Sequence, residues 1–274
     1  MAAGDTSART VLVVGLAFVA LVAVQLLWQR LEAAEEKASP RPRAERVVRR
    51  GNQGATVDDS TSLLLARELA TLSGEADRAR REEVEGQLNA LTAGSVEQRR
   101  VAALFFEYQV DQTAEEALLK ALHDEDSKVA RRSAKALLSL WRHTDSPAVN
   151  RIFQQGLAAY KARDNEEAME IFDSLDSLGR RIADLYRLRA ELYLAQAYAT
   201  DGKPDQALVG KALEDCDTAL AEKQKNFMAL YVQAKCHVAR EDVPSALKSI
   251  DAALAIYPGL QEAGQLKAMI RPSE

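Results

Sequence analysis

The sequence is short of cysteine, histidine and glycine, and each shortage argues against a class of functional site. Its 274 residues include only 2 Cys and 3 His. His123, His143 and His237 share no short spacing with a cysteine or with a pair of carboxylates, so no metal centre is predicted. Cys216 and Cys236 each stand where a helical pattern takes a small apolar residue. Buried free thiols are therefore expected, with a disulfide or a reactive pair as the alternative.

Motifs that carry catalysis are missing as well. The sequence contains no Gly-rich phosphate loop, no nucleophile elbow and no His-Glu-x-x-His pattern. The acidic run around Asp124 fits a polar turn between two helices better than a cation site. We therefore expect a protein that is not an enzyme, with no catalytic residues, no cofactor and no small-molecule substrate.

Strong positive charge is also lacking. The net charge is −5, and residues 1–50 carry eight Lys or Arg against five Asp or Glu, which leaves −8 on the remainder. A surface that binds nucleic acid needs clustered cations, so nucleic acid is excluded as the main ligand. What the chain does have is 47% hydrophobic and 28% charged residues with 5% aromatic residues, a composition typical of an all-α protein.

One long run has no charge at all, from Thr10 to Gln29. A helix of this length spans the hydrocarbon layer of a bilayer, so residues 10–29 are predicted to be a single transmembrane helix behind a short tail, residues 1–9. A cleaved secretory signal is the alternative. Seven of the eight basic residues of the first fifty follow the run, which favours a soluble part that faces the cytoplasm. The Pro- and Gly-punctuated, basic stretch 30–57 is predicted to be a flexible linker.

Two stretches near the C-terminal end share the spacing of a helix-turn-helix unit. Residues 152–172, IFQQGLAAYKARDNEEAMEIF, have small residues at Gly156 and Ala168 and a large one at Phe172. Residues 231–258 repeat the pattern, with Ala234 and Ala246 at the small positions. This spacing resembles the tetratricopeptide repeat (TPR), in which small residues at repeat positions 8 and 20 let two antiparallel helices approach closely.

The distance between these two units predicts an extended repeat between them. Ala168 and Ala246 are 78 residues apart, which is two 34-residue periods plus ten. The middle repeat fits the grid either with Ala195, Tyr198, Gly202 and Ala207 at positions 8, 11, 15 and 20, or with its second helix registered on Ala212, Cys216 and Ala219. The segment 260–270 is expected to be the capping helix that covers the last apolar face.

A second pair of related segments precedes these units. The sequences RRVAALFFEY from Arg99 and RRSAKALLSLW from Arg131 are offset by 32 residues. With the stretch LLKALHDEDSKVARRSAKALLSL, they resemble HEAT-type helical hairpins. The expected fold is therefore an α-solenoid of helical hairpin repeats, HEAT-like over residues 58–145 and TPR over residues 146–274, with the transmembrane helix at its N-terminal end. Because the joint around Ser146 is short, one continuous superhelix is favoured over two independently moving domains.

The TPR resemblance implies where a partner would bind. In that family, positions 2, 5, 9, 12 and 13 of the first helix in each repeat face a bound peptide. On that basis the protein-binding groove is predicted to contain Asn150, Phe153, Leu157, Tyr160, Lys161, Tyr231 and Lys235. The alternative for Phe153 and Leu157 is that they pack against the preceding HEAT-like hairpin.

These expectations together point to a membrane-anchored scaffold or adaptor that recruits a protein or peptide partner through the groove. The clamp with which some TPR receptors hold the C-terminal carboxylate of a chaperone uses Lys, Asn and Arg. This sequence has Phe153, Leu157 and Met228 at aligned positions, so that role is not expected. The alternative function is an assembly, import or quality-control factor on the non-cytoplasmic side of the membrane.

Overall fold

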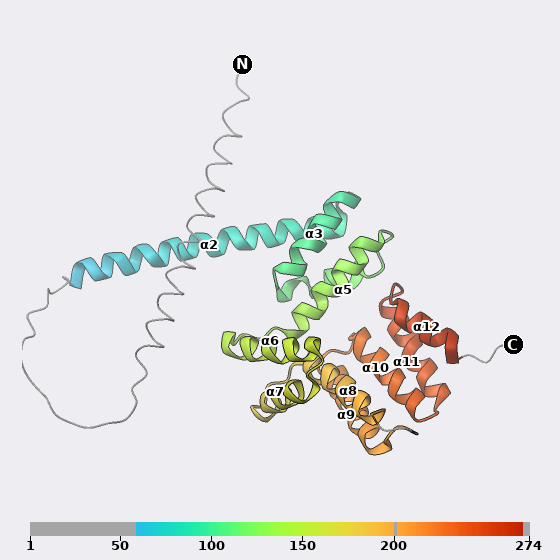
Figure 1. Cartoon of the computed structure of the whole chain (residues 1–274). Coiled ribbons are helices and arrows are strands. Elements are labelled where there is room, and N and C mark those ends of the chain that lie inside the picture. Colours follow the sequence, from blue (N-terminus) through green and yellow to red (C-terminus); the bar gives the residue numbers. More distant parts are fainter. Residues whose placement is uncertain (1–58, 200–201, 271–274) are drawn as a thin grey trace, which may run out of the picture. The chain divides into compact units, whose positions relative to one another are not determined.

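The structure is a computed structural model that describes residues 59–199 and 202–270. The predicted tail, transmembrane helix and linker, residues 1–57, lie outside this part, and within it no helix is long and apolar enough to cross a membrane. The chain divides into two units, residues 1–62 and residues 63–274. Over the described residues the fold is all-α, as predicted, with eleven α-helices, one 3-10 helix and no strand (Figure 1).

The helices of the N-terminal half are of unequal length. They are α2 (Asp59–Ala93), α3 (Val96–Tyr108), the 3-10 turn η1 (Gln112–Ala114), α4 (Glu115–Ala121) and α5 (Ser127–Arg142). The C-terminal half comprises α6 (Pro147–Ala162), α7 (Asn165–Ser177), α8 (Ala183–Ala197), α9 (Gln206–Glu222), α10 (Phe227–Ala239), α11 (Val243–Ile256) and α12 (Gln261–Ile270).

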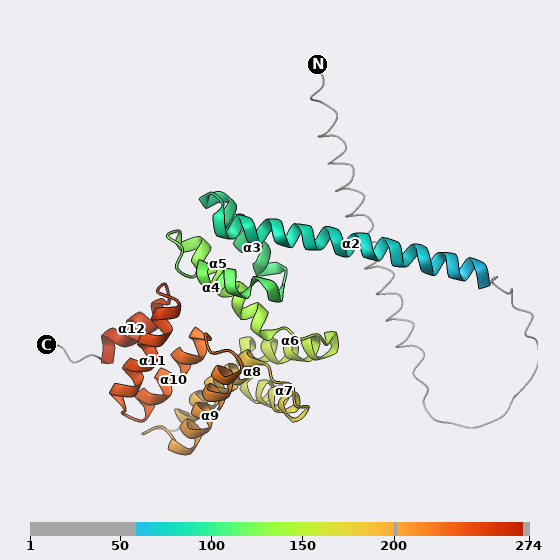
Figure 2. The ribbon, with the colours of Figure 1, turned by 180° about the vertical axis from the view of Figure 1, so that it is seen from behind.

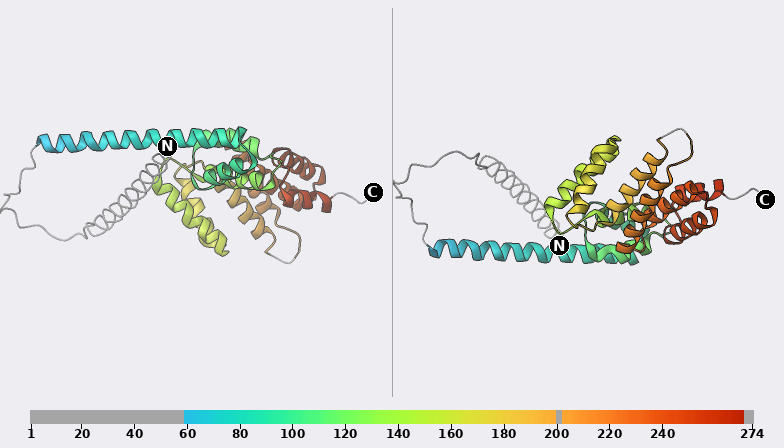
Figure 3. Two further views of the ribbon diagram at one scale, coloured as in Figure 1. Left: turned by 90° about the horizontal axis from the view of Figure 1, so that it is seen from above. Right: turned by 90° about the horizontal axis from the view of Figure 1, so that it is seen from below.

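The C-terminal half consists of three helical hairpins and a final helix. The helices α6 and α7, α8 and α9, and α10 and α11 pack as pairs, and α12 packs on α11 (Figures 1 and 2). In both views of Figure 3 the helices α10 to α12, in red, lie together. Ser146, at the joint between the two halves, is the N-cap of α6, since its side chain accepts a hydrogen bond from the Val149 amide. The predicted capping helix is α12, which buries Ala263.

Small residues set the distance between the two helices of a hairpin. A Cβ added to Gly156 would lie 2.7 Å from Cε1 of Phe172 and 2.9 Å from Cγ2 of Ile171, both on α7. Only a hydrogen fits at this position, so the small residue predicted at repeat position 8 does let the two helices approach closely. Ala234 and Ala246 are likewise 0% exposed.

The middle hairpin settles the choice between the two predicted registers. Ala212, Cys216 and Ala219 are all 0% exposed, whereas Ala195 and Ala207 are exposed. The second register is therefore correct, and Ala190, also 0% exposed, takes the small position on α8. The ten residues by which the middle repeat exceeds the 34-residue period fall between the last turn of α8 and the first turns of α9.

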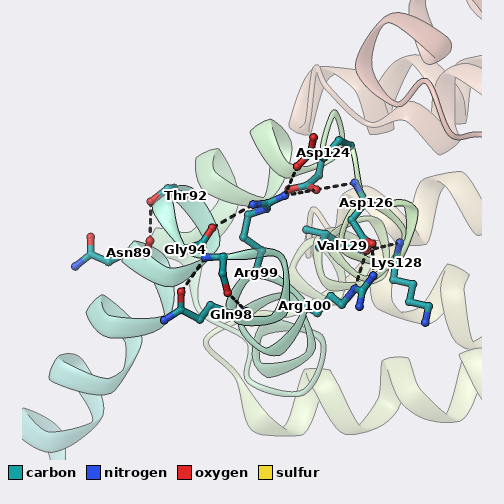
Figure 4. A network of polar contacts seen from close by, with 12 residues as sticks. Asn89, Thr92, Gly94, Gln98, Arg99, Arg100, Asp124, Asp126, Lys128 and Val129 are labelled. Atoms are coloured by element: carbon teal, nitrogen blue, oxygen red, sulfur yellow. Dashed lines mark hydrogen bonds and ion pairs between the residues drawn. The ribbon is translucent and has the colours of Figure 1, made fainter.

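In the N-terminal half, the related segments form α3 and α5, which pack against each other. Arg99 donates from Nε to Oδ2 of Asp124 at 2.7 Å, and Arg100 forms an ion pair with Asp126 (Figure 4). Asp126 also accepts hydrogen bonds from the backbone amides of Lys128 and Val129, so it caps α5. The acidic run is thus a structural turn, as predicted. The likeness of the N-terminal half to HEAT repeats stays a prediction.

One apolar cluster crosses the predicted boundary between the two halves. It contains buried residues of α3, α4 and α5 together with residues of α10, α11 and α12. In this cluster the centre of the Phe227 ring lies 5.8 Å from the centre of the Trp141 ring and 5.3 Å from the centre of the Tyr257 ring. The halves therefore share a core.

Candidate functional site

The first helices of the three hairpins, α6, α8 and α10, carry the positions that the TPR resemblance assigns to a binding groove. The seven predicted residues have different surroundings in the structure. Phe153 is 0% exposed and Leu157 is 5% exposed, and both pack in a cluster with Phe172 and Leu188 of α7 and α8. Phe153 thus lies in the core of the hairpins, and its alternative partner, the preceding HEAT-like segment, is not its main contact.

Asn150 holds the joint between α5 and α6. Its Oδ1 accepts hydrogen bonds from the backbone amide of Thr144 at 2.8 Å and from the Thr144 hydroxyl at 2.9 Å, and its Nδ2 donates to the Thr144 carbonyl at 2.8 Å. An amide side chain satisfied by one residue in this way fixes the turn between the helices. Lys161, by contrast, is exposed at the end of α6.

A buried network of charges fills the middle of the predicted groove. Asp184 on α8 is 0% exposed and pairs with Arg187 one turn on and with Arg142 of α5. Arg187, which is 5% exposed, also lies 3.3 Å from Glu191. Burial alone would raise the pKa of Asp184, but the charges of Arg187 and Arg142 outweigh it and hold that pKa below its usual range.

Tyr160 belongs to the same network. Its hydroxyl donates a hydrogen bond to the Glu191 carboxylate, and its pKa is raised, first by burial and then by the charge of Glu191. The side chain joins α6 to α8 and is half-buried. Tyr160 therefore has a structural partner in addition to its predicted place in the groove.

Tyr231 and Lys235 of α10 are predicted groove residues that are both partly exposed and lie near each other. Lys235 Nζ lies 5.6 Å from the centre of the Tyr231 ring, within cation–π range. The pKa of Tyr231 is raised by burial and then by the charges of Glu262 on α12 and Glu191 on α8. Tyr231 thus stands between the charged network of α8 and the start of α12.

The helix α5 packs against α8 and has a cleft on each side. The smaller, of about 280 Å³, lies beside α6 and includes Asn150, Leu157 and Lys161 together with Arg142 and Tyr108. The larger, of about 720 Å³, lies between α5 and the helices α10 and α12. Because Arg142 at the end of α5 pairs with Asp184 at groove position 2 of α8, α5 covers part of the face that carries the groove positions.

The larger cleft combines an apolar floor with charged walls. Met228, at repeat position 2 on α10, lines it with Leu138 of α5 and Leu260, which precedes α12. Asp124 and Glu125 at one end already pair with Arg99. Arg131 on the α5 wall is exposed and makes no hydrogen bond or ion pair with any residue the structure describes.

Sequence reasoning missed Asp184, Arg187 and Glu191, although they occupy groove positions 2, 5 and 9 of the middle hairpin. Gly156, Ala190 and Ala234 mark position 8 in successive hairpins, 34 and then 44 residues apart. The ten-residue insertion therefore follows Ala190. A repeat grid with position 8 at Ala190 would have placed Asp184, Arg187 and Glu191 at groove positions. Arg142 had no sequence signal, because its role depends on how α5 packs.

Comparison with known proteins leaves the family open. No protein-family model and no curated protein matches the chain. Among solved structures, the first TPR domain of Spaghetti (RPAP3), bound to the HSP90 peptide SRMEEVD, is similar at 20% identity with a TM-score of 0.40, over 47% of this chain and 94% of that one. The described fold is an array of helical hairpins.

Proposed function

We propose that this chain is a non-enzymatic adaptor that is anchored in a membrane by residues 10–29 and binds a partner protein in the cleft between α5 and α10 to α12. The observation that carries the proposal is this cleft, of about 720 Å³, which α5 forms with α10 and the start of α12.

The chemistry of the cleft indicates what kind of segment it takes. Its floor of Met228, Leu138 and Leu260 offers contacts to apolar side chains. Of the two cations on its α5 wall, Lys135 pairs with Glu107 and Arg131 makes no ion pair with a described residue, whereas Asp124 and Glu125 are already neutralised by Arg99. The occupant is therefore a short segment of a partner protein with apolar side chains and a carboxylate that meets Arg131.

A binding experiment with matched variants tests this assignment. Arg131→Glu reverses the charge on the cleft wall, and Lys128→Glu makes the same change on α5 outside the cleft. Met228→Ala removes part of the apolar floor, and Met269→Ala, at a side chain 74% exposed on α12, is its control. The partner is the protein that co-purifies with the full-length chain and both controls and is lost with both cleft variants. If all four variants retain the same proteins, the cleft is not the binding site.

The membrane part of the proposal rests on the uncharged run alone. After carbonate extraction the full-length chain is expected in the membrane pellet, and a chain without residues 10–29 in the soluble fraction. Release of the full-length chain would remove the anchor from the proposal.

Orientation is tested separately. With Asn52→Cys in the predicted linker, an impermeant thiol reagent should leave intact cells unlabelled and label them once the membrane is opened. Cys216 and Cys236, both 0% exposed, add little background in the folded protein. Labelling of intact cells would place the helical array on the far side of the membrane and favour the assembly or quality-control alternative.

A further inference from the structure

The helix α2 extends well beyond the residues with which it packs on the rest of the chain. Val84 and Leu91, near its C-terminal end, are 7% and 3% exposed and belong to the cluster that the two halves share. Every residue from 74 to 83 is exposed, so no described helix packs along this part of α2.

A helix that is exposed on all sides is only marginally stable in water unless another feature supports it. Intrinsic propensity does not support the exposed part of α2, which contains Gly74 with nothing within 4 Å of the position of a Cβ. The ion pair of Arg78 with Glu82, whose side chains are 78% and 65% exposed, contributes little. The exposed part of α2 is therefore expected to pack against another helix.

The spacing of apolar residues in α2 is that of a coiled coil. On one face of the helix they follow each other at intervals of four and three residues, at Leu65, Leu69, Leu72, Ala76 and Ala79. These intervals are those of the a and d positions of a heptad repeat, and the five residues are called the seam below. The seam ends at the next a position, Glu83, and the buried Val84 follows directly. The helix α2 thus has two apolar faces in succession, and only the second packs in the described core.

We infer that the seam pairs with the seam of a second copy of this chain, in a parallel two-stranded coiled coil over residues 65–79. Charge complementarity identifies the partner. In a parallel pair, the residue before an a position in one helix lies beside the residue five positions further along in the other. Glu75 precedes Ala76, and the residue five positions further along is Arg80. Glu75 of each copy therefore meets Arg80 of the other, and the pair forms twice.

The same residues select the parallel orientation. In an antiparallel pair the residues before the a positions, Glu68, Glu75 and Glu82, would face each other, and like charges repel. In the parallel pair Glu68 and Glu82 face Ser73 and Gln87, which are neutral. Under the proposed function both copies are anchored in one membrane, which also favours the parallel orientation and raises their effective concentration.

Sedimentation of the full-length chain in detergent, over a range of concentrations, tests for the dimer. Ala76→Glu places two carboxylates against each other in the seam, so the dissociation constant should rise by at least about tenfold. Ala70→Glu makes the same change on α2 outside the seam and should leave the constant within about twofold. Circular dichroism of both variants shows whether the helical array is still folded.

An exchange of charges tests the partner and the orientation. Glu75→Arg alone and Arg80→Glu alone each replace the attractive pair by a repulsive one, and each should weaken the dimer about three- to tenfold. The double variant restores opposite charges and should return the dissociation constant to that of the wild type. With Ala79→Cys the two copies should form a disulfide on mild oxidation, whereas Arg81→Cys, on the outer face of α2, should not cross-link them.

Three results would overturn the inference. A chain that stays monomeric at every concentration has no second copy on the seam. A dimer that Ala76→Glu leaves intact is joined elsewhere in the chain. A double charge variant that dimerises as weakly as the single ones, or cross-linking at Arg81→Cys equal to that at Ala79→Cys, contradicts the parallel pairing. None of these results depends on the cleft between α5 and α10 to α12, so the proposed function keeps its separate test.

Discussion

Arg142 of α5 and Asp184 of α8 form an ion pair whose carboxylate is completely buried. The pair joins the last turn of the N-terminal half to the first turn of the middle hairpin. Breaking it would leave a charge without its partner inside the protein, which costs far more than the loss of a surface pair. The contact therefore fixes α5 on the concave face.

The first prediction concerns this carboxylate. Asp184→Asn keeps the size of the side chain but removes the charge that Arg142 and Arg187 share, so the free energy of unfolding should fall by about 3–5 kcal/mol. Denaturant unfolding of the full-length chain measures it. Glu82→Gln, in an exposed pair with Arg78 whose side chains are 78% and 65% exposed, should change it by less than about 0.5 kcal/mol. Equal effects of the two substitutions would show that α5 is not held by this pair.

Gly156 provides the second prediction. In Gly156→Ala the new Cβ would meet the Phe172 ring at 2.7 Å, so the two helices must move apart, at a cost of about 1–3 kcal/mol. Gly86→Ala on α2, where nothing lies within 4 Å, should instead raise stability by about 0.5–1 kcal/mol. Thermal unfolding separates the two. A stabilising Gly156→Ala would contradict the close packing of α6 on α7.

Such packing positions are what the sequence could predict. A small residue at Gly156 or Ala246 follows from the distance between two antiparallel helices, which is the same in every hairpin. The N-cap at Ser146 and the acidic turn at Asp126 were equally visible, because capping depends on residues close in sequence. Local chemistry thus predicted the helices, the hairpins and the final capping helix.

The third prediction is a loss of stability at alkaline pH. Burial, followed by the hydrogen bond to Asp176, raises the pKa of Tyr186 from its usual 10.0 to about 12. Because the folded state holds this proton more tightly than the unfolded state, the contribution is complete below pH 10.0 and is lost as the pH rises through about 12. Tyr186→Phe should lower the free energy of unfolding by ~1 kcal/mol at pH 8, and the difference should shrink toward pH 12.

The control for this profile is Tyr108→Phe, at a side chain 75% exposed on α3, which should follow the wild type at every pH. Unfolding temperatures measured from pH 8 to pH 12 give both curves. If the difference in unfolding temperature between Tyr186→Phe and the wild type is the same at every pH, ionisation of the Tyr186 hydroxyl does not change the stability of the fold.

A fourth prediction follows from the core that the two halves share. Phe227, 1% exposed, contacts both Trp141 and Tyr257, so Phe227→Ala should cost about 3–5 kcal/mol and destabilise α5 as well as α10. Tyr198→Ala, at a side chain 53% exposed, should cost less than about 0.5 kcal/mol. Trp141 fluorescence and helical circular dichroism should give one coincident unfolding transition. Two separate transitions would mean that the halves unfold independently.

The residues of the groove show where sequence reasoning stops. Position numbers place Phe153, Leu157 and Tyr160 on the face that usually meets a peptide, and they cannot show what else in the chain covers that face. That Arg142 reaches Asp184 depends on how two segments far apart in the sequence pack together. The binding roles of Tyr231 and Lys235 remain predictions, and the structure adds Arg131 and Met228 beside them.

Hydrogen–deuterium exchange of the free, full-length chain tests most directly whether α5 is a fixed part of the concave face. The account predicts that the amides of α5, residues 127–142, exchange as slowly as those of α8, residues 183–197, and that Asp184→Asn accelerates both together. Fast exchange in α5 beside slow exchange in α8 and α10 would contradict it. The groove would then be open along α6, α8 and α10, and a partner could bind along its whole length.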